Sequence, residues 1–153
     1  MSTTANATSA ASEGGTIEAS AANEAPTADL DAWLNAYIDV LRRAHDHLVS
    51  CDFRGEALAD FLTVVQDLQG QAVDLGYPLA GAVAVSLRHL IDGTPDADRL
   101  PRVLVRQHVE AIRAIVAEGA TGEDHAVGKA LSDTLRNVTD VFVETEAAKS
   151  VAA

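Results

Sequence analysis

Apolar residues recur every three or four positions along most of the chain, which is the spacing of an α-helix with one buried face. The pattern predicts five helices, over residues 29–50, 54–75, 78–91, 100–119 and 123–147. The sequence shows no alternation of apolar and polar residues between hairpin turns, which would be typical of strands, and it contains no internal repeat. Helices joined by short loops favour an all-α fold arranged as an antiparallel bundle.

Each predicted helix carries an apolar stripe that is expected to face the core. In the first helix the stripe consists of Leu30, Trp33, Leu34, Tyr37, Leu41, Ala44 and Leu48. In the second it consists of Leu58, Phe61, Leu62, Val65, Leu68, Ala72 and Leu75. In the fifth it consists of Val127, Leu131, Leu135, Val138, Val141 and Phe142.

The ends of the chain differ from this helical part in composition. Residues 1–28 are mostly Ala, Ser, Thr, Asn, Glu and Gly, and they contain no Lys or Arg. Such a segment buries too little apolar surface to offset the entropy of ordering, so it is expected to be a disordered tail. The division predicted is a tail over 1–28, a helical domain over 29–148 and a frayed C-terminus over 149–153.

Charge and cysteine usage limit the classes of partner. The formal net charge of −12 argues against nucleic acid and anionic membranes as partners. The single cysteine, Cys51, allows no internal disulfide and fits a reducing compartment. No run of 18 apolar residues occurs, and the N-terminus lacks the features of a signal peptide. The expectation is a cytoplasmic protein.

The segment Val65-Gln66-Asp67-Leu68-Gln69-Gly70-Gln71 carries the most informative motif. It resembles the active segment of histidine phosphotransfer (HPt) domains, which present His-x-x-Lys-Gly on an exposed helix face. Gln66 stands at the histidine position of that motif and Gln69 at the lysine position, while Gly70 matches the glycine. The resemblance therefore keeps the glycine and loses the phosphoacceptor.

The resemblance extends over residues 30–142. A bacterial HPt subgroup continues with a Phe-Gly-Tyr-Pro-Leu turn and a Ser-Leu pair, and this chain has residues 75–79, with Leu75 in place of the phenylalanine, and then Ser86-Leu87 and Leu90. Residues 108–116 are also similar to a later helix of that subgroup. The resemblance implies a four-helix bundle built from the second to fifth helices, with the first helix packed against it.

The substitutions at the motif predict that phosphate is not accepted there. A phosphotransfer site needs a nucleophilic imidazole, a cation one turn away and a small residue beside it, all on one helix face. The carboxamide of Gln66 forms no stable phosphoryl linkage, although it can still hydrogen-bond. Gln69 removes the cation, and Asp67 adds a negative charge. The chain is therefore not expected to be an enzyme, and no cofactor or metal is expected.

The docking face can survive the loss of this chemistry. The resemblance implies binding to a response-regulator receiver domain or a histidine kinase, in a two-component phosphorelay, without phosphate transfer. The expected contact strip on the second helix, here called the docking strip, consists of Ala59, Leu62, Gln66, Gln69, Gly70 and Val73. One alternative is that Gln66 and Gln69 are ordinary solvated residues of a structural helical bundle.

A second alternative is a working phosphotransfer protein that uses another histidine. The candidates are His45, His47, His89, His108 and His125. None is followed by lysine at the third position and glycine at the fourth. His45 is expected at the edge of its apolar stripe. Cys51 is expected to be a small buried residue, because the sequence places no paired base beside it.

Overall fold

The computed structural model describes residues 32–152 of the chain, and every regular element among them is helical. A first helix covers residues 32–50. It is followed by α2 (Glu56–Asp74), α3 (Pro78–Asp92), the short 3₁₀ helix η1 (Ala97–Arg99), α4 (Arg102–Ala117) and α5 (Ala126–Ala152). Residues Leu34–Ala153 form one compact unit.

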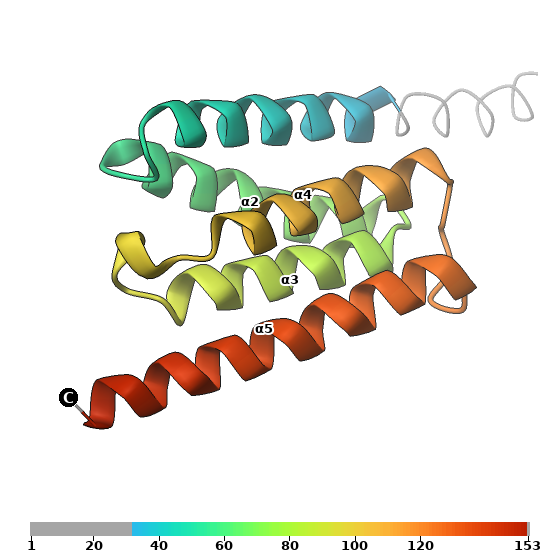
Figure 1. Ribbon diagram of the computed structural model, residues 1–153. Coiled ribbons are helices and arrows are strands. Elements are labelled where there is room, and N and C mark those ends of the chain that lie inside the picture. The colour runs from blue at the N-terminus through green and yellow to red at the C-terminus, as the bar shows by residue number, and fades with distance from the viewer. Residues whose placement is uncertain (1–31, 153) are drawn as a thin grey trace, which may run out of the picture. The chain divides into compact units, whose positions relative to one another are not determined.

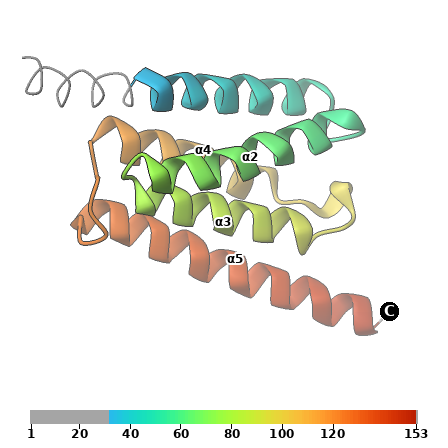
Figure 2. The ribbon, with the colours of Figure 1, turned by 180° about the vertical axis from the view of Figure 1, so that it is seen from behind.

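Within this unit α3 is the central element, because it packs against α2, α4 and α5. The chain reverses direction at each connection from α2 to α5, so that consecutive helices are antiparallel (Figures 1 and 2). The reversals follow from the short loops, because a short connection places each helix antiparallel beside the helix before it.

The core is formed by leucine, isoleucine, valine and alanine, with two phenylalanines as its largest fully buried side chains. The buried positions of α2 repeat at spacings of three and four: Ala57 is 5% exposed, and Phe61, Val65, Leu68 and Ala72 are fully buried. This burial fixes the rotation of α2 about its axis. Successive residues of an α-helix are turned by about 100° around its axis. Once the buried positions are fixed, the residues that α2 presents to solvent are therefore fixed as well.

The turn between helix 32–50 and α2 is held by a contact from α4. Asp52 and Phe53 both have positive φ, at 58° and 60°, which is unusual for residues other than glycine. The guanidinium of Arg102 lies 4.8 Å from the centre of the buried Phe53 ring, and its Nη1 lies 2.7 Å from Asp52 Oδ1. These contacts offset the cost of the left-handed backbone.

Close approach between α5 and α3 depends on small residues. A Cβ added to Gly128 would lie 2.8 Å from Leu79 Cδ1, and one added to Gly93 would lie 2.6 Å from Val143 Cγ1. Both distances are too short for a side chain. Gly128 in α5 and Gly93 at the end of α3 therefore let the two helices pack side chain against backbone at both ends of their contact.

Several sequence predictions need correction. Trp33, Val127, Val138 and Val141 were expected in the core and are exposed. The fifth helix begins at Ala126 and continues to Ala152, five residues beyond the predicted end. His45 is buried rather than at a boundary, and Cys51 is only partly buried. The predicted tail over 1–28 and the core position of Leu30 lie outside the described residues.

The turn at residues 76–78 was predicted correctly. Gly76 has φ +90°, Tyr77 is buried and Pro78 opens α3, as the Gly-Tyr-Pro sequence indicates. Among the helices described, none is both long enough and apolar enough to span a membrane.

Candidate functional site

The docking strip predicted from the sequence lies on the outer side of α2. Gln66, Gly70, Ala59 and Val73 are exposed, whereas Leu62 is half-buried. The buried stripe of α2 lies on the opposite side of the helix. Gln66 and Gly70 stand four residues apart and so share one face. The strip is therefore a continuous surface along the outside of α2.

Gly70 leaves an opening at the centre of the strip. A Cβ built on it would have no heavy atom within 4 Å beyond its own helix, so no packing within the protein requires a glycine here. Glycine costs an exposed helix interior roughly 1 kcal/mol relative to alanine. Its presence lowers the surface beside Gln66, and a partner could approach the helix backbone at this position.

Val73 forms the border between the strip and α3. A Cβ added to Gly81 of α3 would lie 2.7 Å from Val73 Cγ2. The isopropyl group of Val73 thus lies over a glycine of the neighbouring helix, and 54% of the residue is still exposed. Val73 therefore covers the start of α3 and ends the strip on this side.

Gln69, at the position of the motif's lysine, is half-buried rather than extended into solvent. Its Oε1 is buried and has no hydrogen-bond partner. An unsatisfied buried acceptor normally costs about 1–3 kcal/mol. Gln69 consequently supplies neither the cation that a phosphoryl group would need nor an evident gain in stability.

The electrostatic surroundings of the strip are acidic. Next to it, α2 carries an exposed row at spacings of four and seven residues, formed by Glu56, Asp60, Asp67 and Asp74. No Lys, Arg or His occurs anywhere in α2. An incoming phosphoryl group would meet carboxylates without a neighbouring cation on the helix, which is unfavourable at short range.

The five histidines lie in different environments, and none belongs to α2. His45 is packed between Phe53 and Phe61, and burial lowers its pKa. His89 is exposed, with Nε2 3.7 Å from Asp140 Oδ1. His125 accepts a hydrogen bond at Nδ1 from the amide of Gly128, which caps the start of α5. His47 is exposed, and its ring nitrogens lie 3.7 and 3.9 Å from Cys51 Sγ.

His108 is fully buried and joins three helices. Its Nδ1 lies 2.7 Å from the carbonyl oxygen of Leu104, which can only accept, so Nδ1 carries the proton. Nε2 is then an acceptor, 3.0 Å from Ser86 Oγ of α3 and 3.2 Å from Thr139 Oγ1 of α5. Ser86 in turn donates to Thr139 Oγ1 at 3.2 Å. Burial lowers the pKa of His108.

This buried group, called here the Ser-His-Thr cluster, was missed by the sequence analysis. Ser86 and His108 belong to two of the segments that carry the resemblance to HPt domains, and the structure brings their side chains into contact. Because every side chain in the cluster is buried, no substrate reaches the serine hydroxyl. The cluster therefore satisfies polar groups in the core and fixes the relative positions of α3, α4 and α5.

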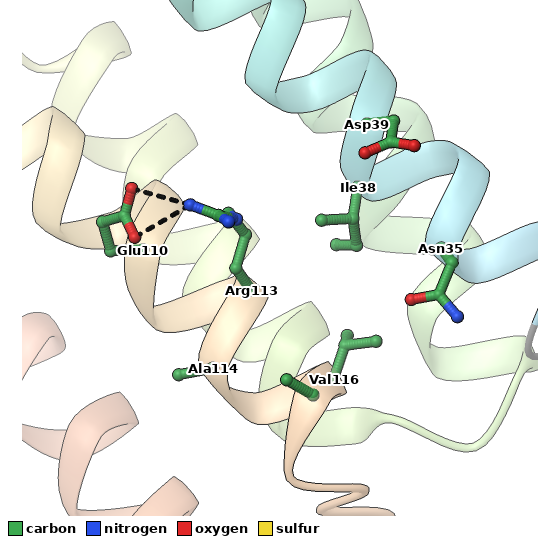
Figure 3. Close-up of a pocket in the computed structure, with 8 residues that line it drawn as sticks. Asn35, Ile38, Asp39, Glu110, Arg113, Ala114 and Val116 are labelled. Carbon is green, nitrogen blue, oxygen red and sulfur yellow. Dashed lines mark hydrogen bonds and ion pairs between the residues drawn. The ribbon is translucent and has the colours of Figure 1, made fainter.

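A groove of about 520 Å³ lies between helix 32–50 and α4. Ile38 and Val116 form apolar walls, and Asn35 and Asp39 lie along the helix 32–50 side (Figure 3). Arg113 donates to both carboxylate oxygens of Glu110 at 3.1 Å. The cation of the groove is thus already paired within the protein, so the groove does not present it to a ligand.

Within residues 32–152 no three His, Cys, Asp or Glu side chains converge closely enough to hold a metal ion. Comparisons of the chain with protein-family models, with curated proteins and with solved structures found no match. The functional reading of the docking strip consequently depends on the sequence motif and on the exposure of the residues themselves.

Proposed function

We propose that the protein is an HPt-like signalling protein that binds a receiver domain, or a histidine kinase, without accepting phosphate. The observation that carries this proposal is the open surface at Gly70 beside the outward-facing Gln66. These are the two positions at which an HPt domain would hold its phosphoacceptor and its small neighbour. The binding face would be the docking strip, and the histidine would be replaced by a carboxamide.

The arrangement of the helices supports the same proposal. An HPt domain is a four-helix bundle, and α2 to α5 here alternate in direction (Figure 1). The buried core is drawn mainly from helix 32–50, α2, α3 and α4, and α5 adds Leu135. The docking strip lies on one outer helix of this arrangement, on the side away from the core. A face with a few apolar side chains around a glycine suits the docking of a helix from a partner. The glycine lets the partner helix approach the backbone of α2, and the apolar side chains around it are buried in the contact.

The chemistry of the strip favours docking over phosphotransfer. The amide of Gln66 can both donate and accept hydrogen bonds where an imidazole would. The row formed by Glu56, Asp60, Asp67 and Asp74 repels a phosphoryl group but attracts a basic partner surface. The protein would then act by occupying a receiver or kinase surface, either to exclude an active phosphotransfer partner or to hold two partners together.

Replacement of Gly70 by tryptophan tests the docking strip directly. The indole would fill the opening at Gly70, so binding to the receiver domains encoded in the same genome should be lost while the fold persists. Binding can be measured by calorimetry or by interferometry with each purified receiver. Gly122→Trp serves as the control, since Gly122 is exposed in the connection between α4 and α5, and an added Cβ has only ordinary contacts there.

The outcomes separate the proposal from its rivals. If Gly70→Trp folds and still binds every receiver that the wild type binds, the docking strip is not the interface. If the wild-type chain binds no receiver and no kinase, it is a structural helical protein. If it takes up acid-labile phosphate from a phosphorylated receiver, it is an active phosphotransfer protein that uses one of its histidines.

A further inference from the structure

The outer flank of α5 carries an exposed row of uncharged residues that the core does not use. The row follows spacings of four and three residues in regular alternation and is called here the α5 row. Its members are Val127, Leu131, Thr134, Val138, Val141, Thr145 and Ala148. None of the seven is charged, although 22% of the chain consists of charged residues.

The spacing of the row is the one with which a helix packs lengthwise against a second helix. An alternation of four and three gives a repeat of 3.5 residues, which keeps a stripe facing a second helix over several turns. The row is sustained over three such repeats, from residue 127 to residue 148. The inner side of α5 is formed by other residues, among them Gly128, Leu135 and Thr139.

The exposed fractions show that most of the row is not covered by other residues in the described part of the chain. Val127 and Val141 are more than 60% exposed, and Val138 is 48% exposed. Leu131 is half-buried because it lies at the edge of the row next to α4. The hydroxyl of Thr145 donates to the carbonyl of Val141 at 2.7 Å, so burial of this threonine would leave no new donor unsatisfied.

A groove of about 480 Å³ runs beside the row, between α4 and α5. Its apolar walls are Ala111 and Ala114 on α4, with Leu131 and Leu135 on α5. Small residues on one side and leucines on the other make a trough into which the side chains of an added helix can pack. The row and the groove together form one surface along the flank of α5.

We propose that this surface is a homodimer interface, in which the α5 row of one chain packs antiparallel against the α5 row of a second copy. A register centred on position 136 places Val127 opposite Thr145, Leu131 opposite Val141 and Thr134 opposite Val138. Each pair occurs twice by symmetry, so the two-fold arrangement buries most of the row on both chains.

The opposite charges at the two ends of α5 favour an antiparallel pairing with a second copy of the same helix. A chain with a net charge of −12 repels a second copy over most of its surface, and the row is where two copies meet without opposed carboxylates. The same register brings Lys149, which pairs with Glu146 of its own helix at 3.7 Å and stays exposed, level with Glu123 and Asp124 before the first turn of the partner helix. The antiparallel orientation also places opposite helix ends side by side.

The first experiment measures the mass of the full chain in solution by light scattering and by sedimentation over a wide concentration range. The expected result is a species of twice the 16.0 kDa of one chain. Val138→Lys combined with Val141→Lys should return the mass to that of one chain, while far-UV circular dichroism keeps its helical signal. Val138→Ser with Val141→Ser gives the milder variant if the lysines impair folding.

Val40→Lys is the matched control, because Val40 lies on helix 32–50 and is 43% exposed, close to the 48% of Val138. The control should remain dimeric. A wild-type chain that stays monomeric at all concentrations overturns the proposal. A dimer that survives both the lysine and the serine substitutions also overturns it, as does a monomeric Val40→Lys variant.

Orientation is tested by a zero-length carbodiimide cross-link, read out by mass spectrometry. Lys149 lies 23 residues after Ala126, where α5 begins, which is about 35 Å at 1.5 Å per residue, and Glu123 precedes that start, so a link between them can only join two chains. The antiparallel register predicts a link from Lys149 to Glu123 or Asp124 in the dimer fraction. A dimer fraction without that link contradicts the antiparallel pairing.

Discussion

Ser86 Oγ lies 3.0 Å from His108 Nε2, and both side chains are buried between α3 and α4. His108 Nδ1 donates its proton to the Leu104 carbonyl, and burial disfavours a second proton on Nε2, so the buried ring is neutral. Protonation at Nε2 would place a positive charge in the core with no carboxylate among the groups that shift its pKa. The Ser-His-Thr cluster therefore couples the fold to pH.

Stability should fall as the pH drops below about 6.5. Burial lowers the pKa of His108, and of His45, below the usual value of 6.5. The unfolded chain then binds more protons than the folded chain in the interval between the two pKa values. The two histidines should contribute no pH dependence to the free energy of unfolding above about pH 7. The free energy of unfolding, measured by urea titration, should decrease from about pH 7 towards pH 5.5.

His108→Leu identifies the share of this effect that belongs to the cluster. The variant should lose stability at pH 7.5, by about 1–3 kcal/mol, because the Thr139 hydroxyl loses the ring acceptor. Its free energy of unfolding should also depend less on pH, with the remaining slope due to His45. An unchanged slope in His108→Leu would show that His108 does not couple stability to pH.

Two glycines near the docking strip should respond to alanine in opposite ways. Both Gly70 and Gly76 have open space where a Cβ would stand, but Gly76 has φ +90° and Gly70 lies within α2. Gly70→Ala should raise the free energy of unfolding by about 0.5–1 kcal/mol, because alanine favours the helix. Gly76→Ala should lower it by about 1 kcal/mol, because alanine strains at positive φ.

Urea or thermal unfolding of both variants, followed by circular dichroism, measures these two changes. If Gly70→Ala proves destabilising, the space above Gly70 is not open and the docking strip has been misplaced. If Gly76→Ala is neutral, the left-handed turn before α3 relaxes without cost.

The fold class and the rotation of α2 could be predicted because apolar periodicity is a local property of the sequence. Phe61, Val65 and Leu68 were assigned to the core from spacing alone, and all three are fully buried. The rotation follows from them and places Gln66 outward. The turn at 76–78 was likewise predictable, since glycine and proline restrict the backbone locally.

The side of α5 that faces the core could not be predicted in the same way. Its valines form a regular row, and such a row looks the same whether it packs on its own core or on another chain. Val138 is outward and Thr139 is inward, because Thr139 finds hydrogen-bond partners in Ser86 and His108. A buried polar position is recognisable only when its partners, here 31 and 53 residues away, are known.

Gln69 offers a stabilising substitution within the docking strip. Its Oε1 is buried without a partner, so Gln69→Met should remove an unsatisfied acceptor and raise the free energy of unfolding by about 1 kcal/mol. Gln66→Met is the control, since Gln66 is exposed and its replacement should change stability by less than about 0.5 kcal/mol. Equal effects in the two variants, measured by urea unfolding, would mean that Gln69 is solvated in solution.

Restoring the motif tests whether α2 still has the geometry of a phosphotransfer helix. The double variant Gln66→His, Gln69→Lys places an imidazole on the exposed face beside Gly70 and a cation one turn away. Lysine at position 69 can extend its charge to solvent past Val73, because its aliphatic stem tolerates a half-buried site. The variant should accept acid-labile phosphate from a phosphorylated receiver that binds the wild type, as measured with radiolabelled phosphate.

The single variants separate the two contributions. Gln66→His alone should be phosphorylated more slowly, because the acidic row of α2 disfavours the incoming charge and no cation offsets it. Gln69→Lys alone should take up none, since it has no nucleophile at position 66. If the double variant binds the receiver but stays unphosphorylated, the helix face no longer presents residue 66 in line with the receiver's phosphoryl group, and the strip is a docking surface of different geometry.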